Sequence, residues 1–134
     1  MDEFVIKSSV DDCSLQFLPP GSGGPSHWRV RVTHHDLDAE ARVYAGKIPT
    51  AWLQSLARDW QGWDDERTCR LGGDDELILS ARHDHRGHIV LGVELWSGLT
   101  DHDWCVRATV VIEAGQLEQL GRNAERFFGN EHCV

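Results

Sequence analysis

The chain has little of what export, membrane insertion or metal binding through cysteine requires. Its N-terminus, Met1-Asp2-Glu3-Phe4, is acidic, and its longest apolar runs are only the length of a strand. A signal peptide needs roughly 7–15 consecutive apolar residues, and a membrane-spanning helix needs about 20. The four cysteines (Cys13, Cys69, Cys105 and Cys133) are scattered, with no Cys-x-x-Cys pair. We therefore expect a cytoplasmic protein with idle thiols and no membrane segment.

Positive charge is also scarce, since 13 Lys and Arg residues stand against 22 Asp and Glu residues, for a formal net charge of −9. Nucleic-acid binding depends on Lys and Arg contacts to phosphate, so this balance argues against nucleic acid and is compatible with a basic protein partner. The acids gather in short runs that include Asp64-Asp65 and Asp74-Asp75. Such runs are typical of solvated turns, and the alternative is an acidic surface that attracts a cationic partner.

Catalytic motifs are absent from the sequence. No Gly-x-Ser-x-Gly segment is present to hold a nucleophile between a strand and a helix. The segment from Pro19 to Ser26 is rich in Pro and Gly, but no Lys-Ser or Lys-Thr follows it. It predicts a hairpin loop and not a phosphate-binding loop. We expect no catalytic residue and no cofactor.

Alternating apolar residues predict strands along most of the chain. The runs are Phe4 to Ile6, Leu15 to Phe17, Trp28 to Val32, Leu37 to Val43, Leu77 to Ala81, Ile89 to Leu95 and Trp104 to Ile112. Cys69 and Leu71 fit one further short strand. Trp28 and Trp104 share the period of their apolar sets, so we predict that both point into the core.

Two segments have helical periodicity. Pro49 is placed to open a helix, and Trp52, Leu53, Leu56 and Trp60 then recur on one stripe before Gly62. A second stripe follows the last strand and consists of Leu117, Leu120, Ala124 and Phe127. We predict helices over about residues 48–61 and 115–128.

These elements predict one α+β domain over residues 1–134. A chain of 134 residues is close to the commonest domain size, and a hydrophobic fraction of 40% with six tryptophans is enough for one core. Strands joined by short turns pair antiparallel, because a parallel pair needs a long crossover. We expect a mainly antiparallel, curled sheet of six to eight strands that carries two helices.

One histidine-rich turn has the composition of a metal site. His83, His85 and His88 lie within six residues and flank Asp84, a ligand set that zinc uses. On a hairpin these side chains would have to converge from its tip and both sides. We therefore predict a polar turn and no bound metal, with the metal site as the alternative. His34-His35-Asp36 would add ligands only if the two turns lay at the same end of the sheet.

Two acids and two tryptophans are candidate binding residues. Glu94 and Glu113 lie on predicted strands; a covered face would perturb their pKa values, whereas an open face, which we favour, would leave them solvated. Trp63 in a polar loop and Trp96 on a polar strand face suit an interface, although packing beneath a loop is the alternative. The tentative binding set is Trp63, Trp96, Glu94, Glu113, Asp64, Asp65, Asp74 and Asp75.

The second part of the chain also resembles a known family. The quoted motifs are Trp60-x-Gly62-Trp63, Glu76-Leu77-x-Leu79-x-Ala81, Asp84-x-x-Gly87-His88-Ile89, Trp104-x-Val106-x-Ala108, Gly115-Gln116-Leu117-Glu118 and Phe127-Phe128. Over about residues 28–128 these resemble a family of small uncharacterised bacterial proteins known as a domain of unknown function. The resemblance implies a shared fold and no catalytic residues.

The sequence favours a non-enzymatic protein-binding module. In size, acidity and class the chain is similar to bacterial immunity proteins, which suggests an immunity or antitoxin-like role by analogy. The alternative is a small-molecule-binding domain or enzyme that uses a cavity between sheet and helices, with Glu94, Glu113 and the turn from His83 to His88 as candidate groups. A homodimer is compatible with both.

Overall fold

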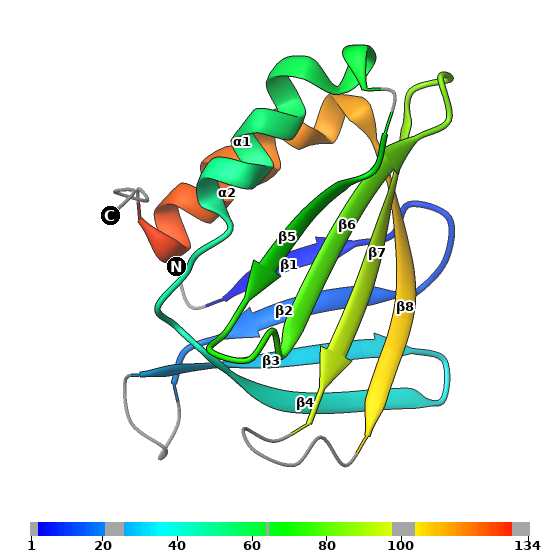
Figure 1. Ribbon diagram of the computed structural model, residues 1–134. Coiled ribbons are helices and arrows are strands. Elements are labelled where there is room, and N and C mark those ends of the chain that lie inside the picture. Colours follow the sequence, from blue (N-terminus) through cyan, green and yellow to red (C-terminus); the bar gives the residue numbers. More distant parts are fainter. Residues whose placement is uncertain (1–2, 21–25, 64, 98–103, 130–134) are drawn as a thin grey trace.

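The computed structural model describes residues 3–20, 26–63, 65–97 and 104–129. Within these residues, eight strands form two four-stranded antiparallel sheets that share two α-helices (Figure 1). Sheet A consists of β1 (Phe4–Lys7), β2 (Ser14–Leu18), β3 (His27–His34) and β4 (Leu37–Tyr44). Sheet B consists of β5 (Arg67–Leu71), β6 (Leu77–His83), β7 (His88–Trp96) and β8 (Cys105–Glu113).

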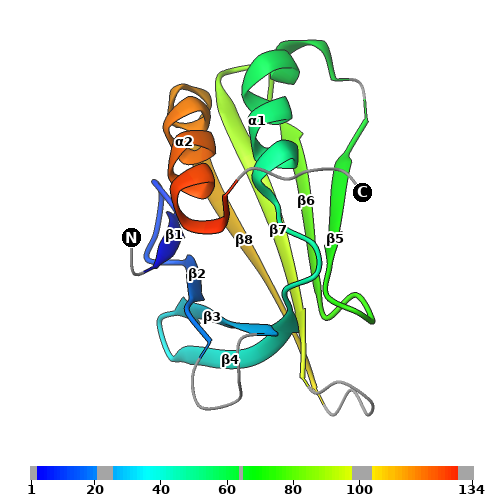
Figure 2. The same ribbon diagram turned by 90° about the vertical axis from the view of Figure 1, so that its left-hand side faces the viewer.

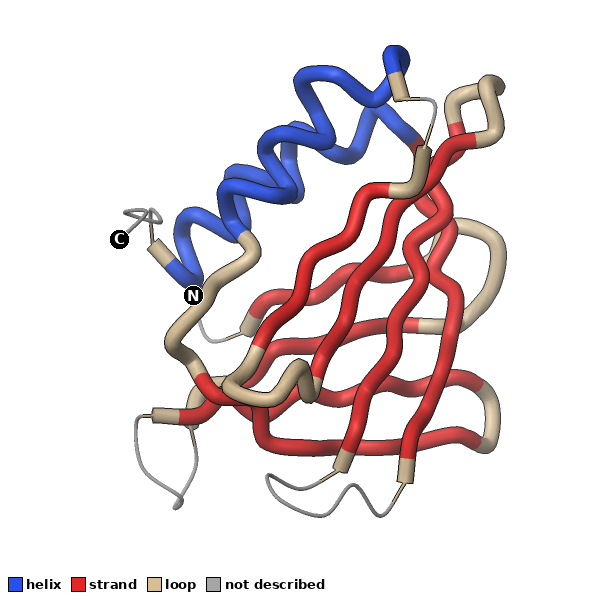
Figure 3. The backbone as a smooth tube through the Cα atoms, viewed as in Figure 1, coloured by secondary structure: helices blue, strands red, loops and turns tan. Residues whose placement is uncertain are grey.

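Strand order follows chain order in both sheets. Short connections favour this arrangement, because they leave each strand beside the one that precedes it. The β3–β4 connection consists of His35 and Asp36, and His35 takes the positive φ of 48° that a tight hairpin turn requires. The predicted antiparallel pairing is confirmed for both halves of the chain (Figure 3).

The helices lie close to their predicted positions. Helix α1 (Thr50–Asp59) continues into a short 3₁₀ turn, η1 (Trp60–Gly62), and α2 (Leu117–Phe128) follows a second 3₁₀ turn, η2 (Ala114–Gln116). Pro49 occupies the N-cap of α1, and Gly129 ends α2 with a φ of 86°. The helices approach closely at Gly121, where an added Cβ atom would lie 3.0 Å from Cγ of Gln54.

The core lies between the two sheets and the helix pair. Alternate residues of most strands are buried over part or all of their length, as in β7, where Ile89, Leu91, Val93 and Leu95 are all at most 3% exposed. Leu53 and Leu56 of α1 and Leu117 and Ala124 of α2 belong to the same core. Figure 2 shows both helices in front of sheet B, with sheet A below them. One face of sheet B is therefore buried, and its other face points away from the helices.

The strands form two separate sheets instead of the single curled sheet that we expected. The long connection through α1 replaces a hairpin between β4 and β5, so the two strands do not pair. The sheets meet instead next to β1 and β8, where the backbone N–H of Ser9 donates to the carbonyl oxygen of Val111 at 2.7 Å. Neither sheet closes on itself.

The prediction for Trp104 is wrong. Trp104 precedes β8 and is 37% exposed, because the buried part of this strand begins only further along the chain. Trp28 does pack where predicted: its ring lies 5.1 Å from that of Phe127 and 5.4 Å from that of Phe128. In the part of the chain that the structure describes, no helix has the length and apolar character needed to cross a membrane.

A neighbouring pair of substitutions tests this burial pattern. Leu91 points into the core, whereas Val90 lies on the outer face of the same strand. We expect Leu91→Ala to lower the free energy of unfolding by about 2–5 kcal/mol, because it leaves a cavity. Val90→Ala serves as the matched control and should cost less. Equal losses for the two variants in chemical denaturation would contradict the assigned faces.

Candidate functional site

The outer face of sheet B holds three of the predicted binding residues. Glu94 and Trp96 of β7 and Glu113 of β8 all alternate with core residues and so lie on this face. Glu94 and Trp96 are partly buried, and Glu113 is exposed. The helices cover the opposite face (Figure 2). The expectation of an open face for the two acids therefore agrees with the structure.

Glu94 is the centre of a polar network on this face. Its carboxylate accepts hydrogen bonds from Nε of Arg107 at 2.7 Å and from Nε1 of Trp96 at 3.0 Å. These bonds, with that of Arg107 the stronger influence, hold the pKa of Glu94 below its ordinary value. Glu94 therefore stays ionised at neutral pH, and the network fixes the indole and the guanidinium in place.

A trough of about 430 Å³ lies beside this network. Its floor is a row of small residues that are direct neighbours across the four strands, namely Thr68, Ser80, Gly92 and Thr109. The next row carries larger side chains, namely Arg70, Ile78, Glu94 and Arg107. At the floor, a Cβ atom on Gly92 would lie too close to Oγ of Ser80, so the Ser80 hydroxyl would have to turn away to make room for it.

The acidic turn residues lie at both ends of β5, with Asp65 before the strand and Asp74 and Asp75 in the turn after it. Asp65 and Asp74 are exposed, and Asp75 is partly exposed and pairs with Arg70 at 3.4 Å. Asp64 lies outside the described residues. Arg70 also lines the trough, so the pair places Asp75 close to the rim of the trough.

Trp63 is buried, with only 3% of its surface exposed. Its Nε1 donates to Asp59 at 2.9 Å, and its carbonyl oxygen lies 3.0 Å from Nε2 of His83. The position matches the alternative reading of a tryptophan packed beneath a loop. The structure therefore removes the Trp63 ring from the candidate binding surface.

Glu113 caps the 3₁₀ turn η2 that follows β8. Its side chain accepts the backbone N–H of Gln116, and the Gln116 side chain accepts the backbone N–H of Glu113 at 2.8 Å. This reciprocal capping box starts the turn that leads into α2. Glu113 also lies 3.7 Å from Nε2 of His88, at the far end of the outer face from Trp96.

The three histidines of the β6–β7 turn fall into two groups, since the rings of His83 and His85 lie 4.3 Å apart, edge to face, and His88 lies apart from this pair. His83 also makes edge-to-face contacts with the rings of Trp60 and Trp63, each with a centroid 5.7 Å away. His88 instead contacts Asp84, whose carboxylate lies 2.8 Å from its Nδ1. Among the described residues, these histidines do not gather around a common point as metal ligands would.

Asp84 organises this turn and gives it a predicted pH dependence. Desolvation raises its pKa, but hydrogen bonds from the backbone of Arg86 and from the backbone and ring of His88 outweigh it and lower the pKa to about 2. Because the folded-state pKa lies below the unfolded value, the stabilisation is complete above the unfolded value and is lost as the pH falls towards the folded value.

An NMR titration of the Asp84 carboxyl carbon tests this assignment. We expect a midpoint near 2, below the ordinary value of 3.8. The Asp84→Asn variant lacks the carboxyl group, so its thermal stability should fall less steeply than that of the wild type as the pH decreases through this window. A midpoint near the ordinary value would show that the hydrogen bonds do not hold in solution.

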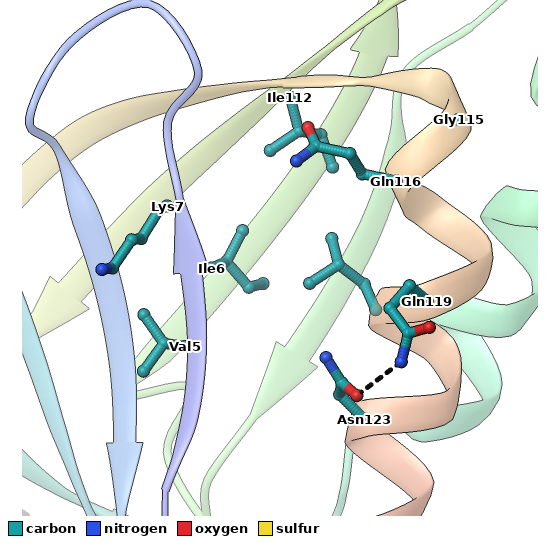
Figure 4. A pocket seen from close by; sticks show the side chains of 9 residues that line it. Val5, Ile6, Lys7, Ile112, Gly115, Gln116, Gln119 and Asn123 are labelled. Carbon is teal, nitrogen blue, oxygen red and sulfur yellow. Dashed lines mark hydrogen bonds between the residues drawn. The ribbon is translucent and has the colours of Figure 1, made fainter.

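A second cavity, of about 470 Å³, lies between β1 and α2. Figure 4 shows Ile6 of β1 and Ile112 of β8 on its apolar side, with Gln116, Gln119 and Asn123 along the helix. Gln119 donates to Asn123 at 2.8 Å, and Lys7 supplies the one cation among the lining residues. We call this cavity the β1–α2 groove. None of the sequence-predicted site residues lines it.

Glu76 is a buried carboxylate that directly follows the acidic run Asp74-Asp75. It is fully buried and accepts the backbone N–H groups of Asp74 and, at 3.2 Å, of Tyr44 at the end of β4. The second bond ties sheet A to the β5–β6 turn of sheet B. Gly72, with a φ of 93°, leaves room for the carboxylate, since a Cβ atom there would collide with it.

The chain matches the model of a family of unknown function (DUF6228) over residues 8–131. The chain belongs to this family. The match covers every strand from β2 to β8 and both helices, and it extends further towards the N-terminus than the resemblance seen in the sequence. No curated protein and no solved structure matches the DUF6228 chain.

Proposed function

We propose that this DUF6228 protein is a cytoplasmic, non-enzymatic protein-binding module that contacts its partner through the outer face of sheet B. The observation that carries the proposal is the trough above Thr68, Ser80, Gly92 and Thr109, with the Glu94 network fixed beside it. A rigid, uncovered sheet face with a preorganised aromatic and an ion pair can bind at low entropic cost. An immunity or antitoxin-like role is one form of such binding.

The titrating groups support a binding role over a catalytic one. Among the described residues, each carboxylate with a displaced pKa (Asp11, Asp12, Asp38, Asp84 and Glu94) has it lowered. Burial raises the pKa values of the Cys13 and Cys105 thiols. All these groups keep their ordinary ionisation at neutral pH, whereas a general acid or an activated thiol needs the opposite displacement.

The charge distribution favours a basic partner. The net charge of −9 attracts cationic proteins over a range of about 8–10 Å at physiological salt. The face itself carries both signs, since Arg107 and Arg70 are paired with Glu94 and Asp75. Exposed Asp65 and Asp74, at the two ends of the edge strand β5, add further negative charge in our proposal. Long-range attraction then comes from the whole chain and local fit from the paired groups.

A blocking substitution in the trough tests the proposal. Thr109→Arg places a long side chain over the floor of the trough on the exposed outer face of β8. Gln16→Arg makes the same charge change on the outer face of sheet A and is the matched control. We expect Thr109→Arg to weaken binding of a partner captured by the wild-type chain at least tenfold, with Gln16→Arg close to wild type.

The same binding measurement at two salt concentrations tests the electrostatic part. Association should slow as salt rises, because screening weakens attraction between exposed charges, while the melting temperature changes little. Reversing the charges of Asp65, Asp74 and Asp75 should have a similar effect without unfolding the chain.

For the blocking substitution, equal binding of the partner by Thr109→Arg and Gln16→Arg would refute the assigned face.

The β1–α2 groove favours a second candidate function, the binding of a small molecule. Its volume of about 470 Å³ lies within the range of ligand pockets, and amide side chains lie beside an apolar wall. Native mass spectrometry of the purified protein tests this alternative. A retained metabolite that is lost on Asn123→Trp, which fills the groove, would support it over the protein-binding role.

A further inference from the structure

His34 and His35 lie side by side because of the β3–β4 turn. Consecutive residues of a strand point to opposite faces. His34 is the last residue of β3, and His35 leaves the strand with a φ of 48°. The two rings therefore come together, with their centroids 4.2 Å apart. Two imidazoles at one hairpin tip are available to a shared ligand.

Asp12 completes a three-residue cluster from a separate loop. Its Oδ1 lies 2.8 Å from Nδ1 of His34, and its Oδ2 lies 3.2 Å from Nδ1 of His35. The backbone N–H of His35 also donates to Oδ2 at 3.1 Å, which fixes the carboxylate against the turn. One ligand atom from each of the three side chains lies within 4.8 Å of the others.

The ring of His34 faces Asp12 without an aligned hydrogen bond at its Nδ1. Its Nδ1 has almost no exposed surface, yet it has no aligned hydrogen-bond partner among the described residues despite its closeness to Asp12. Buried polar atoms are nearly always satisfied, since leaving one unpaired costs free energy. An ion held between the two rings and the carboxylate would engage this nitrogen.

We propose that Asp12, His34 and His35 bind a divalent transition-metal ion of the Zn²⁺ class. Two imidazole nitrogens and one carboxylate form a ligand set that Zn²⁺ accepts, whereas Mg²⁺ and Ca²⁺ prefer oxygen ligands alone. Three protein ligands leave a fourth position for water or for a ligand from a partner. The proposal departs from our sequence-based expectation of no metal, and it is independent of the outer face of sheet B.

Isothermal titration calorimetry of metal-free protein with Zn²⁺ tests the site. We expect one equivalent to bind and the affinity to fall at least tenfold in His35→Asn and in Asp12→Asn. Asn accepts a positive φ, so the turn should survive the His35 substitution. His85→Asn is the matched control, because His85 is also an exposed turn histidine with a positive φ of 63°. It should keep wild-type affinity.

Cobalt spectroscopy provides the second readout. Co²⁺ bound by the two imidazoles and the carboxylate should give visible absorption bands that His35→Asn abolishes and His85→Asn keeps, with circular dichroism confirming that both variants are folded. The proposal is overturned if Zn²⁺ does not bind, or if His35→Asn and His85→Asn bind it equally well.

Discussion

The burial of one face of each sheet in a shared core is the constraint on which the rest of the structure depends. Two four-stranded sheets contribute alternate residues to it, and the paired helices fill the side that the sheets leave open. The buried Glu76 carboxylate joins the two halves through the backbone of Tyr44. With one face of sheet B committed to the core, its other face is free to carry polar residues and the trough.

That free face gains its rigidity from the same core. The strands that carry Gly92 and Glu94 outward carry Leu91, Val93 and Leu95 inward, so each outward residue is fixed by buried neighbours. Side chains held in this way lose little freedom when a partner binds. The paired charges of Glu94 and Arg107 further restrict the exposed guanidinium. The buried residues that stabilise the fold therefore also hold in place the outer-face side chains that we propose contact a partner.

The period of the apolar residues predicted the strands and helices. The trough on sheet B instead depends on contacts between distant segments, which this period does not show. The alternation from Ile89 to Leu95 identified a buried face correctly, but at Trp104 the same pattern continued past the end of the core. Trp63 looked exposed in the sequence because the residues that cover it come from distant segments, His83 among them. The trough row depends on cross-strand register, which turn lengths set and composition does not show.

The central claim is that sheet B binds through its outer face, and isoleucine methyl groups report on it directly. Ile78 lines the trough, Ile6 and Ile112 line the β1–α2 groove, and Ile89 lies in the core. Methyl NMR of isoleucine-labelled protein, titrated with a partner captured by the wild-type chain, distinguishes these positions in one sample. The account predicts a shift of the Ile78 resonance with Ile6 and Ile112 unchanged. Shifts of Ile6 and Ile112 without Ile78 would contradict it.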